Sequence, residues 1–333
     1  MTTNATVVIA PDSFKGTMSA DVVAEALAAG VGDAGATPVI VALADGGEGT
    51  AEVLRKVLAA KTLVVPTTGP LGQAIEGSIL ISGDGTIAVV ETATATGLHL
   101  SSPTPTNAEA ATTYGTGVLI AAAAAAGASD IWVGVGGSAS TDGGRGALEA
   151  IADAGGIGGA TLTVLCDVST SFLDAARVFA PQKGADPDTV ARLESALAKF
   201  ARQLPLDPRT VPRTGAAGGL SGALWAAHDA RLVSGIDHVL DLVHFDEILS
   251  CADAVITGEG RLDSQTAEGK VISGVTHRAL QRAVLVWATV GRCDVDADGL
   301  RDLHIATAVE AGNPEALRDA ARTLTTAAFD TGS

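Results

Sequence analysis

The stretch "ATVVIAPDSFKGTMSADVVAEALAAGV" (Ala5–Val31) passes from an apolar run through a polar loop into an alanine-rich segment. The β-branched run predicts a buried strand, and Ser19 suits the N-cap position of a helix through the alanine-rich part. The same order follows at once, with "TPVIVALA" as strand, "DGGEGT" as loop and "AEVLRKVLAA" as helix. Two such units in succession are typical of a parallel sheet whose strands are joined by helices.

The pattern changes after Lys61 and returns near Ala252. In between, "TLVVPTTG", "AIEGSILIS" and "TIAVVETATA" are short strand-type runs separated by glycine-containing turns, which predict antiparallel hairpins. A helix is expected near "AEAATTYGTGVLIAAAAAAG", and the spacing of "DPDTVARLESALAKFARQL" predicts an amphipathic helix. We therefore predict an α/β protein in which residues 1–62 and 251–333 form one parallel-sheet domain and residues 63–250 form an inserted second α/β domain.

The net charge and the amino-acid composition disfavour several classes of binding partner. The chain of 333 residues has a formal net charge of −17, which disfavours nucleic acid and anionic membrane surfaces as partners. Its most apolar run, "VLIAAAAAAGA", is shorter than the roughly 20 residues needed to span a bilayer. The three cysteines lack zinc-ligand spacing, and "MTTNATVVIAPD" lacks the pattern of a signal peptide, so a reducing, cytoplasmic location is expected.

Four glycine-containing loops are placed to bind an anion. Each follows an apolar strand and precedes a helix, and each mixes glycine with charge: Pro11–Gly16, Asp45–Thr50, Gly136–Gly144 and Thr257–Asp263. In parallel α/β sheets, the loops after the carboxyl ends of the strands line the crevice where ligands bind. Glycine lets backbone N–H groups approach an anion, and the following helix N-terminus favours negative charge.

The charges in these loops suit phosphoryl transfer. Lys15, Arg261 and Lys270 could pair with phosphate or carboxylate oxygens. A magnesium ion needs only one or two carboxylates besides phosphate oxygens and water, and the candidates are Asp45, Glu48, Asp142, Glu259 and Asp263. Phosphoryl transfer depends mainly on positioning and charge neutralisation, which such a set can supply.

The same residues are also compatible with purely structural roles. Glycine and aspartate are common in β-to-α turns and helix caps, so any single loop fits about equally well without a ligand. "GAAGGLSGAL" (Gly215–Leu224) fits close helix packing at least as well as ligand contact. "AEGKV" fails as a phosphate-binding P-loop because Val271 replaces Ser or Thr, and "GVGGSA" fails as a dinucleotide fingerprint because Ala139 replaces the last glycine.

Seven motifs together resemble those of the bacterial glycerate kinases. They occur in the family's order from about Val7 to past Val290: "VIAPDSFKGTMSA", "ADGGEGT", "TTYGTG", "GVGGSASTDGG", "VFAPQKGA", "GAAGGLSGAL" and "VITGEGRLDSQTAEGK". The resemblance implies an ATP-dependent kinase that uses magnesium and phosphorylates D-glycerate, usually at the 2-hydroxyl. It also implies a flavodoxin- or Rossmann-like domain formed by both chain ends, with a second α/β domain inserted. The chain departs from the family in two shorter segments, around "IADAGGIGGATLTVLCDV" and "STSFLDAAR".

Residue roles follow from the motifs as expectations. Lys15, Asp45, Asp142 and Arg261 are the predicted catalytic residues, and Asp45 and Asp142 are the predicted magnesium ligands. Predicted contacts to substrate or phosphate come from Ser13, Gly46, Gly47, Gly136, Gly137, Ser138, Lys183, Glu259 and Lys270. Three alternatives remain: a kinase of a related hydroxy acid, a non-catalytic nucleotide or phosphate sensor, and a dehydrogenase, which the failed fingerprint disfavours. The sequence does not determine the oligomeric state.

Overall fold

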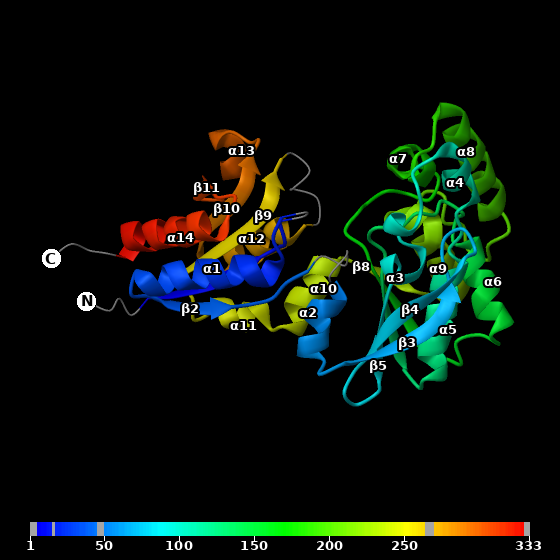
Figure 1. Cartoon of the computed structure of the whole chain (residues 1–333), viewed down its shortest axis with the longest axis horizontal. Helices are drawn as coiled ribbons and strands as arrows, with labels where there is room; N and C mark the ends of the chain where they lie inside the picture. The colour runs from blue at the N-terminus through cyan, green and yellow to red at the C-terminus, as the bar shows by residue number, and fades with distance from the viewer. Residues whose placement is uncertain (1–4, 15–16, 45–49, 264–269, 330–333) are drawn as a thin grey trace. The chain divides into compact units, whose positions relative to one another are not determined.

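Both ends of the chain build one compact unit, and the middle builds another. The computed structural model describes residues 5–14, 17–44, 50–263 and 270–329. Unit 1 consists of Met1–Asp45 and Ile236–Ser333, and unit 2 consists of Gly46–Gly235 (Figure 1). This is the α/β architecture with an insertion expected from the sequence. The units divide at 45/46 and 235/236 rather than at the expected 62/63 and 250/251. The first boundary is earlier because α2 (Thr50–Val57) contacts strand β5 (Ile87–Glu91) of unit 2. The second is earlier because acids within residues 237–246 form ion pairs with Arg278 of unit 1.

Unit 1 contains a parallel sheet of flavodoxin-like order. Its strands lie in the order β11-β10-β9-β1-β2, and all neighbouring pairs are parallel. Numbered along the chain, this is the order 2-1-3-4-5, in which the direction of winding reverses between the first and third strands. The switch point therefore lies between β1 and β9. The bounds are β1 Thr6–Pro11, β2 Thr37–Ile40, β9 Ala254–Leu262, β10 Leu285–Cys293 and β11 Thr307–Glu310.

Helices cover both faces of this sheet. Helices α1 (Ala20–Asp33) and α14 (Pro314–Phe329) lie side by side, where a Cβ at Gly30 would stand 2.1 Å from the carbonyl oxygen of Arg318 (Figure 1). They enclose a core with Val7, Ile9 and Trp287. Helix α12 (Val271–Gln281) contacts β1, β9 and β10. Helix α13 (Ala297–Asp302) lies between β10 and β11 in the chain.

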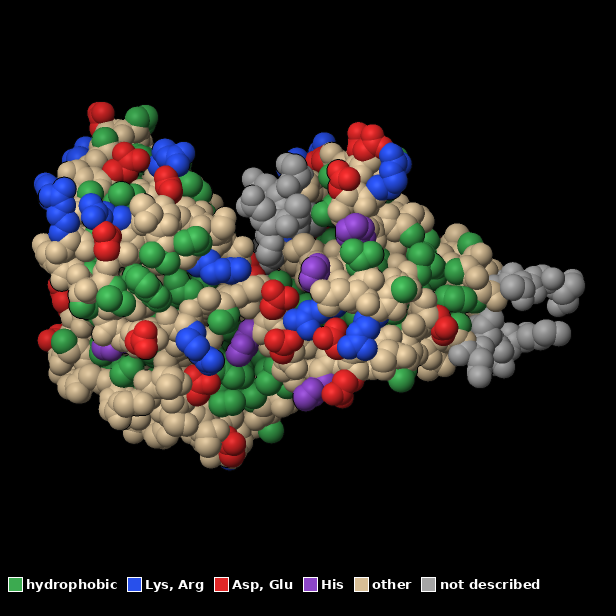
Figure 2. Space-filling view, turned by 180° about the vertical axis from the view of Figure 1, so that it is seen from behind, with side chains coloured by type: hydrophobic (Ala, Val, Ile, Leu, Met, Phe, Trp, Pro, Cys, Tyr) green, Lys and Arg blue, Asp and Glu red, His purple; other side chains and the backbone are tan. Residues whose placement is uncertain are grey.

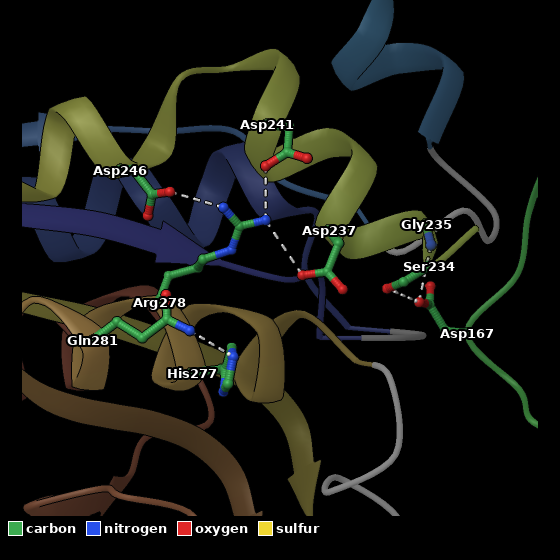
Figure 3. Close-up of polar contacts among 9 residues, drawn as sticks. All are labelled: Asp167, Ser234, Gly235, Asp237, Asp241, Asp246, His277, Arg278 and Gln281. Carbon is green, nitrogen blue, oxygen red and sulfur yellow. Dashed lines mark hydrogen bonds and ion pairs between the residues drawn. The ribbon is translucent and has the colours of Figure 1, made fainter.

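Arg278 joins three helices of unit 1. Helix α10 (Gly235–Leu242) carries two acids and α11 (Phe245–Leu249) one, and all three pair with this arginine of α12 (Figure 3). The guanidinium lies 2.7 Å from Asp241, 2.9 Å from Asp246 and 3.5 Å from Asp237, and its side chain is only 15% exposed. At the end of unit 2, Asp167 accepts hydrogen bonds from the hydroxyl of Ser234 and the backbone N–H of Gly235 (Figure 3). The ion pairs of Arg278 therefore hold α10 and α11 against α12.

Unit 2 contains a mixed sheet in the order β3-β4-β5-β6-β7-β8. The pairs β3/β4 and β4/β5 are antiparallel, which confirms the predicted hairpins, and the pairs from β5 to β8 are parallel. The remaining bounds are β3 Lys61–Thr68, β4 Ala74–Ile81, β6 Asp130–Gly134, β7 Thr161–Leu165 and β8 Arg231–Val233.

The helices of unit 2 pack through small residues. A Cβ at Gly117 of α5 would stand 2.4 Å from the carbonyl oxygen of Ala147 of α6, so the two helices meet backbone to backbone. The bounds are α3 Ala93–Thr96, α4 Pro105–Ala110, α5 Tyr114–Ala125, α6 Arg145–Asp153, α7 Ala175–Phe179, α8 Pro187–Ala201 and α9 Leu220–His228. Short 3₁₀ turns span Leu98–Leu100, Pro181–Lys183 and Ala216–Gly219.

The helix expected near residues 108–127 is present as α5, but the first residues of that stretch belong to a separate short helix, α4. The helix is interrupted at residues 111–113. There the backbone N–H of Thr113 donates to the carboxylate of Asp142 and does not continue the helical hydrogen bonding. The amphipathic helix expected near residues 186–204 is confirmed as α8, whose N-cap is Asp186.

The surface carries mixed charge. On the face shown in Figure 2, the coloured Lys and Arg side chains are interspersed with acidic ones and form no continuous basic area. Among the helices in the described part of the chain, none combines the length and apolar character that a membrane span requires.

Candidate functional site

The predicted site residues fall into two groups and a remainder. Unit 1 holds Ser13, Glu259, Arg261 and Lys270, and unit 2 holds Gly136, Gly137, Ser138, Asp142 and Lys183. Four others lie outside the residues that the structure describes: Lys15, Asp45, Gly46 and Gly47. Each group is described within its own unit.

In unit 1, a cleft of about 450 Å³ lies at the carboxyl ends of the parallel strands. We call it the switch-point cleft, because the segments after β1 and β9 line it together with the ends of β10 and β11. Ligands of open α/β sheets bind at this position. The cleft brings together the four residues predicted for unit 1, although Ser13 and Glu259 are 246 positions apart in the chain.

Both cations and carboxylates line the cleft. Lys270 Nζ lies 3.7 Å from the carboxylate of Glu259, whose side chain is 9% exposed. Lys270 is also the N-cap residue of α12, so the positive end of a helix adjoins the cleft. Just after the end of β1, the backbone N–H of Ser13 donates a hydrogen bond to Oδ1 of Asp12 at 2.6 Å. The lining thus combines groups that bind oxyanions with carboxylates that bind cations.

Two arginines share one aspartate beside the cleft. Arg261 Nε donates to Asp294 Oδ2 at 2.6 Å, and Arg292 Nε donates to Asp294 Oδ1 at 2.7 Å. Hydrogen bonds from Arg292 and Arg261 lower the pKa of Asp294 below its ordinary value, so this carboxylate stays ionised at neutral pH. Both guanidinium groups remain open to solvent, with their side chains 62% and 70% exposed.

In unit 2, two glycine-rich segments pack against each other. The segment Gly136–Gly144 follows β6, and the segment Gly215–Gly219 precedes α9. The backbone N–H of Gly143 donates to Gly218 O at 3.0 Å, and a Cβ at Gly218 would stand 2.2 Å from Ser140 O. Ala217 and Gly218 also adopt left-handed conformations, with φ of 49° and 64°. Close packing therefore explains Gly218 of "GAAGGLSGAL", and it also explains Gly219, where a Cβ would stand 2.8 Å from the Cα of Gly143.

Asp142 is the centre of a hydrogen-bond network in this cluster. Its Oδ2 accepts from the backbone and hydroxyl of Thr113 at 2.9 and 2.8 Å, from Thr112 Oγ1 at 3.2 Å and from Gly146 N at 3.1 Å. Its Oδ1 accepts from Gly144 N at 3.0 Å. Both oxygens are engaged within the protein, which favours a structural role, and the predicted roles as base or metal ligand stay predictions.

Lys183 is buried in the same cluster. The sequence suggested a loop residue facing an anion, but the side chain is buried, with 3% exposure of the residue, and lies at the end of a 3₁₀ turn. Its Nζ donates to Ser138 Oγ at 3.2 Å and to the carbonyl oxygen of Ser140. Burial lowers the pKa of Lys183 to about 7, and the charge of Asp142 opposes this shift in part. The buried hydroxyls of Ser140 and Thr141 make no hydrogen bond within the described residues.

Sequence reasoning missed Arg292 and Asp294. Neither lies in a glycine-rich motif of the kind that identified the other loops. The signal that could have found them is "GRCD", a basic and an acidic residue directly after the strand "AVLVWATV". The carboxyl end of that strand faces the same edge of the sheet as the ends of β1 and β9.

Comparison with known proteins decides the family. The sequence profile of the Glycerate kinase family matches residues 7–155 and 156–331. The chain belongs to this family. The resemblance drawn from the seven motifs is therefore confirmed, and the protein is an enzyme, a phosphotransferase with an alcohol group as acceptor.

Individual relatives of this glycerate kinase family member cover most of its length. The glycerate kinase of Halalkalibacterium halodurans is 38% identical over 323 residues, which cover 86% of this chain and 85% of the relative. The glycerate 2-kinase of Escherichia coli K12 is 38% identical over 310 residues, with coverage of 82% and 81%. A crystal structure of a Salmonella typhimurium LT2 protein provisionally assigned as glycerate kinase 2 superposes with a TM-score of 0.82 at 33% identity, covering 98% of each chain.

Proposed function

We propose that this enzyme transfers the γ-phosphoryl group of ATP to D-glycerate and forms 2-phosphoglycerate rather than 3-phosphoglycerate. The observation that carries the proposal is the switch-point cleft, where cations, carboxylates and a helix N-terminus adjoin one cavity of about 450 Å³. The choice of the 2-hydroxyl is supported by the relative from Escherichia coli, which is named a glycerate 2-kinase.

In this proposal, the cations of the cleft bind the anionic groups of the reactants. Arg261 and Lys270 lie at the ends of elements that the sheet holds in fixed positions, so their charges can neutralise oxygens without rearrangement. Ser13 supplies a hydroxyl group at the end of β1. Such contacts suit phosphoryl transfer, in which the enzyme orients the reactants and offsets the charge of the phosphate.

The carboxylates of the cleft fit a magnesium ion bound together with the nucleotide. Asp12, Glu259 and Asp263 line the same cavity as the cations, and a magnesium ion takes only one or two protein carboxylates when phosphate oxygens and water fill its other positions. When bound, the ion offsets the charge of the β- and γ-phosphates. Within the described residues, no group of three or more metal-ligating side chains is found, so the proposal relies on phosphate oxygens and water for the remaining positions.

The remaining roles stay part of the proposal. Lys15 would add a cation after β1, Asp45 would accept the hydroxyl proton or bind magnesium, and Gly46 and Gly47 would cradle phosphate oxygens. We also propose a cytoplasmic location, where ATP is available.

The test is turnover by the purified protein. With ATP, magnesium and D-glycerate, ADP release should require all three components. The ³¹P signal of the product should be split by the single carbinol proton if the phosphate is on the 2-hydroxyl, and by the two methylene protons if it is on the 3-hydroxyl.

Each alternative has its own outcome. ADP release with another hydroxy acid but not with D-glycerate would identify a kinase of a related substrate. Nucleotide binding without ADP release by folded protein, across several hydroxy acids, would overturn the proposal in favour of a nucleotide or phosphate sensor.

A further inference from the structure

Arg261 and Arg292 stand directly side by side at the carboxyl end of the unit 1 sheet. They are register partners on the neighbouring parallel strands β9 and β10. Neighbouring strands are about 4.8 Å apart, and like charges placed directly opposite each other destabilise a sheet. Both residues also line the switch-point cleft. The fold therefore concentrates two positive charges at the position where the family's anionic reactants are proposed to bind.

Asp294 holds the two guanidinium groups but offsets only part of their charge. One of its oxygens accepts from each arginine Nε, so a single negative charge is shared by two positive ones. Asp263 lies 3.7 Å from Arg261 Nε, whereas no second ion pair involves Arg292 within the part of the chain that the structure describes. Arg292 is thus the more weakly neutralised member of the pair.

This arrangement is not explained by stability alone. Exposed ion pairs contribute little to stability, and the side chains of Arg261 and Arg292 are 62% and 70% exposed. An arginine at either position could be replaced by a neutral residue without leaving a buried charge unpaired. The guanidinium group, in contrast, is the side chain best suited to bind a carboxylate or phosphate through two parallel hydrogen bonds.

We infer that Arg292 and Arg261 form a two-arginine clamp for an oxyanion of the reactants, with Asp294 setting the spacing of the two guanidinium groups. The clamp rests on the proposed function and adds Arg292 to the residues that bind the reactants. The oxyanion is either the carboxylate of the hydroxy acid or the terminal phosphate of the nucleotide.

The test compares Arg292→Ala and Arg292→Lys with Arg322→Ala. Arg322 is a matched control, because it lies in the same unit, is 52% exposed and pairs with Asp319 on α14. Arg292→Ala should raise the KM for one reactant at least tenfold and leave Tm unchanged. Arg292→Lys should recover only part of this loss, since an ammonium group cannot make the paired contacts. Arg322→Ala should match the parent.

The identity of the affected reactant distinguishes the two sources. A raised KM for D-glycerate alone assigns the clamp to the carboxylate, and a raised KM for ATP alone assigns it to the phosphate. If Arg292→Ala matches Arg322→Ala in both KM values and in kcat, the clamp is overturned.

Binding measurements separate failure of the clamp from failure of the proposed function. If the parent enzyme does not turn over D-glycerate, calorimetry can still measure the binding of ATP and of D-glycerate. The affinities of the parent and of Arg292→Ala are then compared. Binding by the parent that weakens at least tenfold in the variant supports the clamp although the proposed reaction has failed. Binding that is equal in the two proteins, or absent from the parent, overturns the clamp.

Discussion

The switch-point cleft and the glycine-rich cluster of unit 2 use charge in opposite ways. In the cleft, arginines remain more than half exposed and share their counter-ion. In the cluster, Lys183 is buried, and Asp142 accepts five hydrogen bonds from its surroundings. Glycine-rich loops with one charge look alike in sequence, but one set leaves charge available to a ligand and the other uses it to fix a strained backbone.

The largest expected effect tests the strained backbone. Gly218 and Gly158 have almost the same φ, +64° and +61°, but a Cβ at Gly218 would stand 2.2 Å from Ser140 O, whereas a Cβ at Gly158 would meet nothing within 4 Å. Gly158→Ala should therefore lose only about 1–2 kcal/mol, the cost of a left-handed conformation. Gly218→Ala should lose about 1–3 kcal/mol more, because the backbone must shift.

Urea denaturation of the two variants measures the difference. Equal free energies of unfolding would mean that the segments Gly136–Gly144 and Gly215–Gly219 separate at little cost, and the comparison between the rigid cluster and the open cleft would fail.

The next effect concerns the buried lysine. The pKa of Lys183 is lowered from its ordinary value of 10.5 to about 7 in the folded protein. Between these values the unfolded chain holds a proton that the folded chain has released, so the contribution of Lys183 to the free energy of unfolding rises with pH. The expected slope is about 1.4 kcal/mol per pH unit between pH 7 and 10.5, and it vanishes below pH 7, where both states are protonated.

Lys183→Met should remove this slope from the pH profile of stability. Lys199→Met, at an exposed position in the last turn of α8, is the control and should retain the parent's profile. A parent and a Lys183→Met variant with parallel profiles from pH 7 to 9 would show that the ammonium is not held in a desolvated site.

A substitution at Asp142 tests whether its carboxylate has a structural or a catalytic role. Asp142→Asn keeps the size of the side chain but turns an acceptor-only group into one that also presents donors to Thr113 and Gly146. Hydrogen bonds to charged groups contribute about 1.5–3 kcal/mol each, so we expect a loss of about 2 kcal/mol in the free energy of unfolding. Asp153→Asn, at an exposed acid of α6, should change it by less than about 0.5 kcal/mol. A lost kcat at unchanged stability would instead assign Asp142 to the chemistry.

The smallest expected effect is that of a substitution at Lys15, which tests whether this residue belongs to the candidate site. Lys15 follows β1 in the sequence, outside the described residues, and is proposed to add a cation to the site. Lys15→Ala should lower kcat/KM about tenfold, equivalent to about 1.4 kcal/mol, and leave Tm unchanged. The exposed Lys56 of α2 is the control, and Lys56→Ala should be kinetically silent. Equal kinetics in both variants would remove Lys15 from the site.

The fold class was predictable because it depends on local patterns repeated along the chain. Strand, loop and helix follow one another around Val7 and again around Val255, and both runs entered the same sheet. The break between α4 and α5 was not predictable, because it depends on a hydrogen bond from the Thr113 backbone to Asp142, which lies 29 positions away. Local helix propensity contains no information about a hydrogen-bond acceptor that approaches the backbone only in the folded chain.

The lining of the candidate site was predictable only where a motif marked it. Glu259 and Lys270 were identified by a glycine-rich loop and do share the cleft. The burial of Lys183 and the pairing of Arg292 with Arg261 depend on tertiary packing and strand register. Neither property leaves a trace in the residues next to these positions.

The pairing of β1 with β9 has a consequence for synthesis on the ribosome. Val7 lies beside Ala254, so the pairing of β1 with β9 can form only after the whole of unit 2 has been made. At about 5–20 residues per second, the amino-terminal strand waits roughly 10–50 s for its central neighbour, whereas unit 2 is continuous and can fold during that time. Nascent chains arrested before residue 254 should therefore hold a protease-resistant unit 2 and a protease-sensitive amino-terminal segment, and a protected segment would contradict this order. The enzyme's cleft is thus completed late in translation, after the inserted unit has had time to fold.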